Sequence, residues 1–420
     1  MQTAIGEPKT GSDEEAFGVS AVLDFPGKTF ELCYKATAGP LASDIDPLLA
    51  AALLPAMKLG APLHLANPIS PKLLGAVDQI QDIFHAWDTA LIPVSVKAPT
   101  KSITAADSVR QVACFFSGGV DSFYTVLKHR DEIDQLIFVH GFDIRLADAD
   151  VWARISGSIH TAAAELGKPL IEVATNLQEF SDTFLHWNFY HGAALASVAL
   201  LLSPLFRKVY VPATHTYAQL LPWGSHPLVD PLWSTETVEI IHDGCEATRL
   251  DKVRLLANSA TALKYLRVCY KNRRAPWKDV YNCGQCEKCL RTKINLYLAG
   301  ALDRCATFDH RLDLEAISHL PIPNESVRAY ILENLDAAQR LGTDQALMQA
   351  MQNSLHSYDA ETSGIGRRID ACKATMQRLE EENAAMQMSL QALYQSRSWR
   401  LTGPLRALAD GCKKLRSWKA

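Results

Sequence analysis

Cysteine is scarce in this chain, neither sign of charge dominates, and no apolar run is long. The 420 residues include 10 cysteines, too few for a fold held together by disulfides. The 42 basic and 46 acidic residues give a net charge of -4, so the basic excess of a nucleic-acid-binding protein is absent. The most apolar stretch, residues 193–206, is shorter than the roughly 20 residues that a membrane helix needs, and we expect a buried helix there. These absences favour a cytoplasmic protein with reduced thiols and no nucleic-acid partner.

The composition that remains is that of an ordinary folded protein, with 48% hydrophobic and 21% charged residues. The chain is longer than the roughly 250–300 residues that one core supports, which predicts several domains. A loose tail over residues 1–16 and a small α/β region up to residue 108 form the first part. The elements expected there are strands over 19–25, 29–34 and 91–96 and helices over 45–57 and 71–87.

Strand and helix patterns alternate between residues 109 and 298. The expected strands are the apolar runs 112–116, 136–140, 170–173 and 208–212, and the expected helices are 122–129, 149–166 and 187–202. Strands that are apolar throughout and separated by helices predict a parallel sheet with helices on both faces. Ligands bind such sheets at the carboxyl ends of the strands.

The remainder of the chain is predicted to be helical over residues 299–357, followed by a linker over 358–366 and a coiled coil. Apolar residues from Ile369 to Leu393 repeat at alternating spacings of three and four, and Asn383 occupies an a position. This pattern predicts a parallel two-stranded coiled coil and therefore a homodimer. The alternative is a single amphipathic helix that packs on the body of the protein.

The end of the chain is rich in basic residues and contains two tryptophans. Residues 396–420 contain seven basic side chains and one acid, Asp410, interleaved with Trp399 and Trp418. Such a segment suits the surface of an anionic membrane, in this case as a peripheral protein at the inner membrane, or is simply a solvated helix end. It also resembles tails of some bacterial glycosyltransferases and neighbouring enzymes, which implies a membrane-surface or glycan-pathway partner.

The most informative segment is a glycine-rich loop after the strand at 112–116. Its residues are Ser117, Gly118, Gly119, Val120, Asp121 and Ser122, and a helix pattern starts there. The glycines allow a sharp turn, and the open N–H groups of a first helical turn attract phosphate. The two serine hydroxyls add donors, and Asp121 is suited to hold Mg²⁺ against a pyrophosphate.

This loop resembles the SGGxDS loop of the PP-loop, or N-type, ATP pyrophosphatases, which include GMP synthetase and asparagine synthetase. The resemblance implies an adenine nucleotide alpha hydrolase-like fold. It also implies an enzyme that cleaves ATP between the α- and β-phosphates, transfers AMP to a substrate oxygen and lets a nitrogen or sulfur nucleophile displace the AMP. By the order of elements, it places His140 and Asp143 beside the nucleotide.

Further candidate residues follow the later strands. His215 comes after the strand at 208–212 and is a candidate ligand of substrate or phosphate. Thr248 is placed to cap a helix in which Arg249 and Lys252 would neutralise the leaving pyrophosphate. Solvated or structural roles are the alternatives at each of these positions. Weaker candidates, for substrate contacts or for a nucleophilic thiol, are Glu236, Asp243 and Cys245.

Four cysteines predict a metal site. Cys283, Cys286 and Cys289 have CxxCxxC spacing, and Cys269 lies 14 positions upstream of the first. Four thiolates suit a closed tetrahedral Zn²⁺ site with a structural role. An iron–sulfur cluster uses the same ligands, and unliganded thiols are the third possibility.

The cluster resembles the zinc site of the 7-cyano-7-deazaguanine synthases, in which a similar arrangement follows an SGGxDS-type loop. The resemblance covers residues 109–298, whereas the gap between the cysteines and the sequence after the loop differ. The function it implies is ATP-dependent, AMP-forming activation of a small carboxylate or amide for a nitrogen nucleophile. Two alternatives stay open, a nucleotide-binding scaffold that dimerises through its coiled coil and a tRNA sulfur transferase.

Overall fold

The computed structural model describes residues 3–12, 16–102, 110–271, 280–342 and 344–395. The chain divides into two compact units, Met1–Ser354 and Leu355–Ala420. The basic tail that the sequence predicts, residues 396–420, lies outside the described residues. Within the described part, no helix combines the length and apolarity that crossing a bilayer requires.

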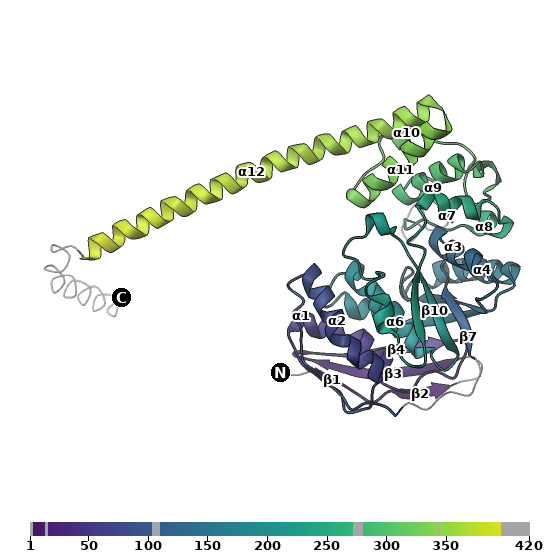
Figure 1. The fold of residues 1–420 in the computed structure, drawn as a ribbon, viewed down its shortest axis with the longest axis horizontal. Helices are drawn as coiled ribbons and strands as arrows, with labels where there is room; N and C mark the ends of the chain where they lie inside the picture. Colours follow the sequence, from purple (N-terminus) through teal and green to yellow (C-terminus); the bar gives the residue numbers. More distant parts are fainter. Residues whose placement is uncertain (1–2, 13–15, 103–109, 272–279, 343, 396–420) are drawn as a thin grey trace, which may run out of the picture. The chain divides into compact units, whose positions relative to one another are not determined.

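One eleven-stranded sheet runs through the described part of the first unit (Figure 1). Its strands are β1 (Thr3–Ile5), β2 (Lys9–Ser12), β3 (Phe17–Phe25), β4 (Lys28–Ala36), β5 (Leu63–His64), β6 (Val96–Lys97), β7 (Gln111–Phe115), β8 (Gln135–His140), β9 (Leu170–Thr175), β10 (Phe206–Pro212) and β11 (Glu239–Asp243). The α-helices are α1 (Asp46–Leu59), α2 (Pro71–Trp87), α3 (Val120–Lys128), α4 (Ala149–Leu166), α5 (Leu177–Ser181), α6 (Trp187–Leu201), α7 (Arg249–Leu256), α8 (Ala260–Tyr265), α9 (Glu287–Leu298), α10 (Leu314–Ser318), α11 (Glu325–Leu341) and α12 (Gln345–Gln395). Short 3-10 turns are η1 (Tyr217–Gln219), η2 (Asp230–Trp233) and η3 (Leu302–Arg304).

The parallel half of the sheet has the strand order β11-β10-β7-β8-β9. The chain proceeds from β7 through β8 to β9 in one direction and then returns to place β10 on the other side of β7. The strand order therefore reverses between β7 and β10. A crevice forms at such a reversal, outside the carboxyl ends of the strands, because the connecting segments leave in opposite directions.

Helices cover both faces of this half. Alternate residues of β7 belong to different cores, Ala113 and Phe115 to one and Val112 and Cys114 to the other. Helices α1 and α6 pack on the first face, and α3 and α4 on the second (Figure 1). The prediction of an α/β fold with helices on both faces of a parallel sheet is confirmed here, and so is the buried helix in the most apolar stretch, α6.

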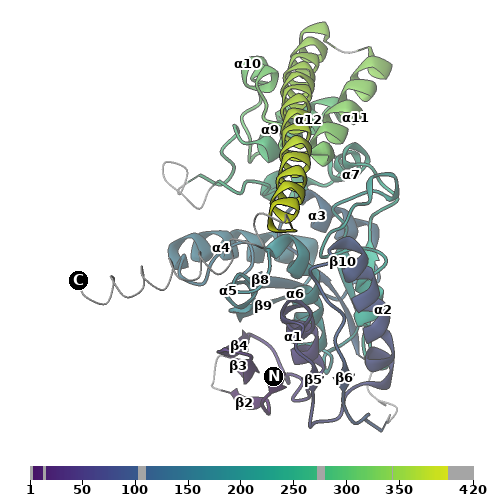
Figure 2. The same ribbon diagram turned by 90° about the vertical axis from the view of Figure 1, so that its left-hand side faces the viewer.

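The N-terminal strands extend the same sheet. β4 pairs antiparallel with β9, and β3, β1, β5 and β6 follow in that order, which makes the complete sheet mixed. Figure 2 shows the purple strands β3 and β4 beyond β9. The prediction of a loose tail over residues 1–16 is wrong, because β1 pairs with β3 and β5 and β2 pairs with β3. These strands are too short to carry a recognisable alternation.

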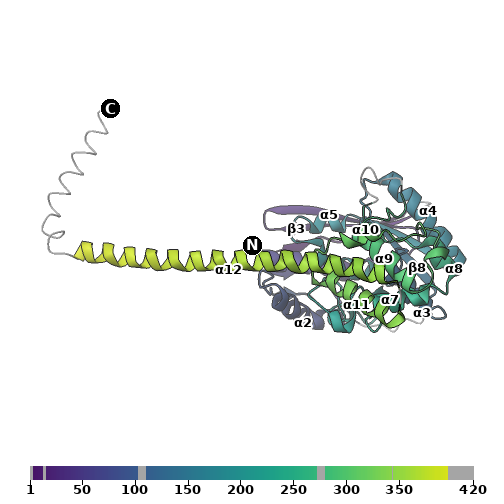
Figure 3. The ribbon, with the colours of Figure 1, turned by 90° about the horizontal axis from the view of Figure 1, so that it is seen from above.

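Helix α12 is continuous over 51 residues (Figure 3). The prediction of a linker over residues 358–366 is wrong, because the helix passes through it; each glycine costs only about 1 kcal/mol in a helix. The residues at the predicted coiled-coil spacing of three and four from Ile369 to Leu393 form a seam along α12. On this seam, the exposed fraction is 62% for Met376, 54% for Leu379, 63% for Met386 and 47% for Leu390. The side chains of Ile369, Cys372 and Leu393 lie outside the described part.

Candidate functional site

The glycine-rich loop joins β7 to α3 at the point where the strand order reverses. Gly118 has a φ of +73°, and a Cβ atom there would lie 2.7 Å from Ile159 Cδ1, so only glycine fits. Gly119 is the N-cap residue of α3 and has no side chain to cap the helix, which leaves its first N–H groups open to a ligand. The Ser122 hydroxyl donates to Gly119 O at 3.1 Å and braces the turn.

Asp121 joins the loop to α7 through two ion pairs. Arg249 Nη1 donates to Asp121 Oδ2 at 2.6 Å, and Lys252 Nζ donates to Oδ1 at 3.0 Å. Both cations are buried, with exposed fractions of 7% and 2%. The predicted N-cap of this helix is confirmed, because Thr248 Oγ1 accepts from Asp251 N at 3.1 Å. The cap fixes the first turn of α7 and hence the place of both cations.

These cations control the protonation of Asp121. Burial acts to raise the pKa of this carboxyl, but the charges of Arg249 and Lys252 outweigh it and lower the pKa to about 2. The loop therefore holds an ionised aspartate with two cationic partners. The predicted role of Asp121 as a Mg²⁺ ligand stays a prediction.

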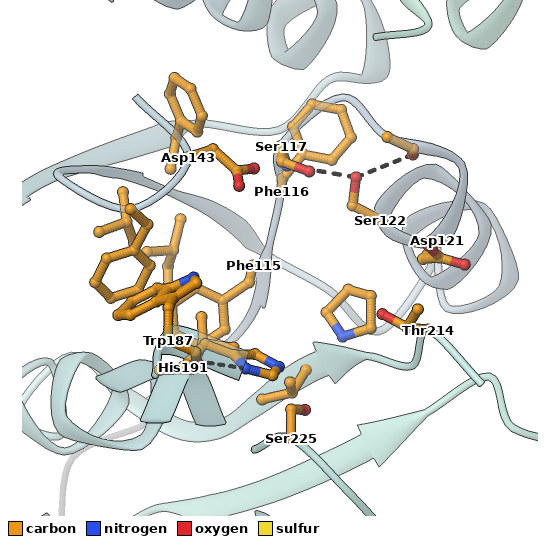
Figure 4. A pocket seen from close by; sticks show the side chains of 18 residues that line it. Phe115, Phe116, Ser117, Asp121, Ser122, Asp143, Trp187, His191, Thr214 and Ser225 are labelled. Carbon is orange, nitrogen blue, oxygen red and sulfur yellow. Dashed lines mark hydrogen bonds between the residues drawn. The ribbon is translucent and has the colours of Figure 1, made fainter. Parts of the chain in front are cut away.

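An apolar cavity of about 250 Å³ opens at the carboxyl ends of β7, β8 and β10 (Figure 4). Its lining includes Phe115, Phe116, Ser117, Ile137, Phe138, Val139, Phe142, Asp143, Trp187, His191, Leu195, Thr214 and Ser225. Figure 4 shows Asp143 and Ser117 on one side of the space and Trp187 and His191 on the opposite side. Aromatic walls with a few polar groups at the rim are typical of small-molecule sites.

A second, polar cavity of about 110 Å³ lies on the other side of the loop. Three cations line it: Arg249, Arg267 and Lys288. The two cavities share four lining residues, namely Ser117, Gly119, Asp121 and Asp143. The glycine-rich loop is thus the common wall of an apolar and a cationic space.

Two candidate histidines have different surroundings. His215 is 8% exposed, and both ring nitrogens lack a hydrogen-bond partner among the described residues. Burial lowers its pKa to about 4, so the ring is neutral near pH 7. Its neighbour Thr214, rather than His215, lines the apolar cavity. The His140 ring stacks on Trp152 at 4.0 Å between centroids, and neither cavity includes it in its lining.

The weaker candidates hold the fold together. Glu236 accepts hydrogen bonds from Ser70 Oγ at 2.6 Å and from Lys72 N at 2.7 Å. It thereby ties the start of α2 to the segment before β11. Asp243 accepts from Thr125 Oγ1 at 2.9 Å and from Lys128 Nζ at 2.8 Å. Cys245 is 2% exposed.

The apolar cavity has a buried polar support on the side of Ser225. Ser225 Oγ donates to Asp230 Oδ2 at 2.6 Å, and the same oxygen lies 2.7 Å from His242 Nδ1. Burial disfavours the charged form of His242, but hydrogen bonds to Asp230 and Cys245 raise its pKa to about 9. The imidazolium and the carboxylate therefore form a buried ion pair that holds Ser225 in place.

The four predicted metal ligands converge. Cys269, Cys283, Cys286 and Cys289 are buried, and their sulfurs lie within 4.8 Å of one another. The Cys283–Cys289 and Cys286–Cys269 sulfur distances are 3.9 and 4.0 Å. A tetrahedral site with Zn–S bonds of about 2.3 Å separates its sulfurs by about 3.8 Å. The cluster could hold a metal ion such as zinc, with all four positions closed by protein.

Asn282 joins the two segments of the cluster. Its Oδ1 accepts from Val268 N at 3.0 Å and from Cys269 N at 3.2 Å, and its Nδ2 donates to Leu266 O at 2.8 Å. The backbone of Cys269 is thereby held beside Cys283. Gly284 has a φ of +72°, which allows the loop to turn back toward its own sulfur ligands.

Sequence reasoning missed several residues that line the two cavities. These residues are Trp187, His191, Ser225, Arg267 and Lys288. Lys288 lies inside the CxxCxxC segment. The spacing of the cysteines predicted metal binding there, and the charge of Lys288 was not considered. Arg267 lies two residues before Cys269, outside the CxxCxxC spacing, and Trp187, His191 and Ser225 come from segments without a motif. Only the fold brings these residues to the loop.

Comparison of the chain with protein-family models, with curated proteins and with solved structures finds no match. The function is therefore inferred from the sequence motifs together with the geometry of the loop, the two cavities and the cysteine cluster.

Proposed function

We propose that the protein is an ATP-dependent, AMP-forming enzyme of the adenine nucleotide alpha hydrolase-like fold. It adenylates an oxygen of a small carboxylate or amide and releases pyrophosphate. A nitrogen nucleophile then displaces AMP, so that a carbon–nitrogen bond forms as the bond to AMP breaks. The proposal joins the sequence resemblance to PP-loop ATP pyrophosphatases and 7-cyano-7-deazaguanine synthases with the arrangement of the site. Its location would be the cytoplasm, where thiolates stay available to a metal.

One observation carries the proposal: the glycine-rich loop separates an apolar cavity from a cationic one. A nucleoside is planar and largely apolar, whereas a polyphosphate is small and anionic. An ATP molecule that crosses the loop would place its base and ribose among Phe115, Phe138 and Trp187 and its β- and γ-phosphates toward Arg249. The α-phosphate, at which the bond breaks, would lie at the shared wall.

The chain's own residues supply electrostatic stabilisation. Open N–H groups at the start of α3 face the phosphates, and Arg249 and Lys252 favour the negative charge that the leaving pyrophosphate gains. Asp121 holds these two cations at the loop. Mg²⁺ would accompany ATP, and Asp143, at the junction of the two cavities, offers the carboxylate oxygen that this ion prefers.

Product analysis tests this function. Purified protein is incubated with Mg²⁺-ATP and pooled small carboxylates, and the nucleotide products are separated. We expect AMP and pyrophosphate from the wild type, and at least about tenfold less from Ser117→Ala, since Ser117 lines both cavities. The matched control is Ser318→Ala, because the Ser318 hydroxyl bonds Leu314 O within α10 and should not affect turnover. Formation of ADP and phosphate instead would contradict the proposal.

We also propose that α12 pairs with the α12 helix of a second copy. Met376, Leu379, Met386 and Leu390 expose between 47% and 63% of their surface along one seam, and association would cover them. Asn383 lies on the same seam and favours a parallel register. A membrane-surface or glycan-pathway partner of the basic tail remains a prediction.

Light scattering after size exclusion measures this association. We expect a mass of twice 46.3 kDa for the wild type and of one chain for Met386→Glu, which puts a charge into the seam. Met388→Glu is the control, because Met388 is 66% exposed but lies off the seam, and it should remain dimeric. A monomeric wild type at micromolar concentration would favour the docked helix instead.

A further inference from the structure

The cationic cavity lies between the glycine-rich loop and the cysteine cluster. Two of its cations belong to the metal-binding segments themselves. Arg267 precedes Cys269 by two residues, and Lys288 stands between Cys286 and Cys289 at the start of α9. The metal ligands and these cations therefore lie on the same short backbone segments. Because of this, a metal ion that fixes the sulfurs also fixes the backbone positions of Arg267 and Lys288.

The metal-binding segment also contacts the backbone of the loop. Arg267 N donates to Gly118 O at 2.8 Å, and Asn282 Oδ1 holds the next two N–H groups, those of Val268 and Cys269. A short backbone segment thus connects the metal ligand Cys269 to Gly118, the residue whose positive φ shapes the loop. The route from Cys269 to Gly118 is three residues and one hydrogen bond long.

The cations and open N–H groups of this cavity are suited to bind an anion. Arg249, Arg267 and Lys288 line the cavity with two carboxylates, Asp121 and Asp143, and the open N–H groups at the start of α3 add positive potential. Cys269 lines it too, and a Zn²⁺ ion with four thiolates is anionic overall, so an anion would be bound by these particular cations and not by a net positive charge of the cavity. Arg249 is 7% exposed, and its Nε has no hydrogen-bond acceptor among the described residues. At about 110 Å³, the cavity has less than half the volume of the apolar one, at about 250 Å³. It suits a small anion better than a nucleoside.

We propose that Arg267 and Lys288 bind inorganic pyrophosphate, and that a metal ion at the cysteine cluster holds them in place to do so. The cluster is then a part of the nucleotide site as well as a structural site. Loss of the metal releases two cations from the polar cavity and the backbone support from the loop. The identity of the anion rests on the proposed function, in which pyrophosphate is the leaving group.

Titration calorimetry with pyrophosphate tests the proposal on the full chain loaded with zinc. We expect Lys288→Met to bind pyrophosphate at least about tenfold more weakly, since one charge-assisted hydrogen bond is lost. Lys288 is exposed, so this variant should fold. Arg267→Gln should weaken binding similarly. The matched control is Lys264→Met, because Lys264 lies three residues before Arg267, is 56% exposed and pairs with Glu165.

Removal of the metal by a chelator supplies the second measurement. We expect the metal-free chain to keep its helical circular dichroism and to lose pyrophosphate binding. Full affinity without metal would overturn the role given to the metal. Equal affinities of wild type, Lys288→Met and Arg267→Gln would overturn the assignment of the cations, and so would a wild type that binds no pyrophosphate.

The product assay with ATP separates this proposal from the function on which it rests. AMP formation together with equal pyrophosphate affinities would leave the function standing and remove the inference. Pyrophosphate binding that depends on Lys288, without AMP formation from any substrate pool, would leave the anion site standing and remove the function.

Discussion

Asp121→Asn is expected to lower the free energy of unfolding by about 3 kcal/mol and to abolish AMP formation, since loss of one partner leaves buried charges uncompensated. The Asp121 carboxylate pairs with Arg249 at 2.6 Å and with Lys252 at 3.0 Å. Asparagine keeps the shape of the side chain but not its charge, so both cations would remain buried without a counterion. Urea denaturation measures the stability, and product analysis measures the activity.

The control for Asp121→Asn is an exposed ion pair. Asp336 pairs with Arg340 on α11, and the two side chains are 61% and 72% exposed. Asp336→Asn should change the free energy of unfolding by less than about 0.5 kcal/mol, because solvent screens such a pair. Equal losses in the two variants would show that the Asp121 pairs do not contribute more than a surface pair.

The same ion pairs predict a dependence on pH. The pKa of Asp121 is lowered from 3.8 to about 2. A carboxyl whose pKa is lower in the folded state stabilises that state above its unfolded pKa and loses this contribution as the pH falls toward the folded pKa. The contribution of Asp121 to the free energy of unfolding of the wild type should therefore fall by about 1 kcal/mol between pH 6 and pH 3. Asp121→Asn should lack that part of the pH dependence in urea denaturation.

Cys289→Ala is expected to remove the metal and to lower the free energy of unfolding by more than about 3 kcal/mol, since metal binding to such sites is coupled to folding. Cys289 is fully buried in the first turn of α9, and its sulfur lies 3.9 Å from that of Cys283. Without it, three thiolates cannot close a tetrahedral site. Elemental analysis of the purified chain measures the bound metal.

The matched control is Cys305→Ala. Cys305 is also fully buried, but its sulfur faces Thr307 at 3.6 Å rather than the cluster. This variant should keep its metal and lose only about 1–2 kcal/mol for the missing volume. Bound iron together with visible absorbance would show that the four cysteines hold an iron–sulfur cluster and not zinc. A wild type free of any metal after purification under reducing conditions would contradict the site.

Elements with strong periodicity could be predicted to within a few residues. Helices α2 and α4 begin and end where the spacing of apolar residues predicts. Elements whose signal is weak could not be predicted. β1 and β2 contain three and four residues, and the helix pattern of α12 overrides its serine and glycine content.

The candidate site divides in the same way. The loop and the cysteine cluster could be found because each concentrates its chemistry in a few consecutive residues. Arg267, Lys288 and His191 could not, because their roles depend on distances between segments that are far apart in the sequence. Arg249 and Lys252 could be predicted only in part. Their charges suggested a role at a phosphate, but their contacts with Asp121 span 128 and 131 positions of the sequence and could not be predicted.

The local features can be read from consecutive residues alone: the turn that only glycine permits, the cap of α7, the apolar strands and the spacing of three thiolates. Each depends on backbone sterics or on neighbours within one helical turn. Two further features, the extension of the central sheet by the N-terminal strands and the division of an apolar cavity from a cationic one by the loop, can be read only from the folded chain. Those arrangements follow from which buried faces pack together, and packing joins residues without regard to their separation along the chain.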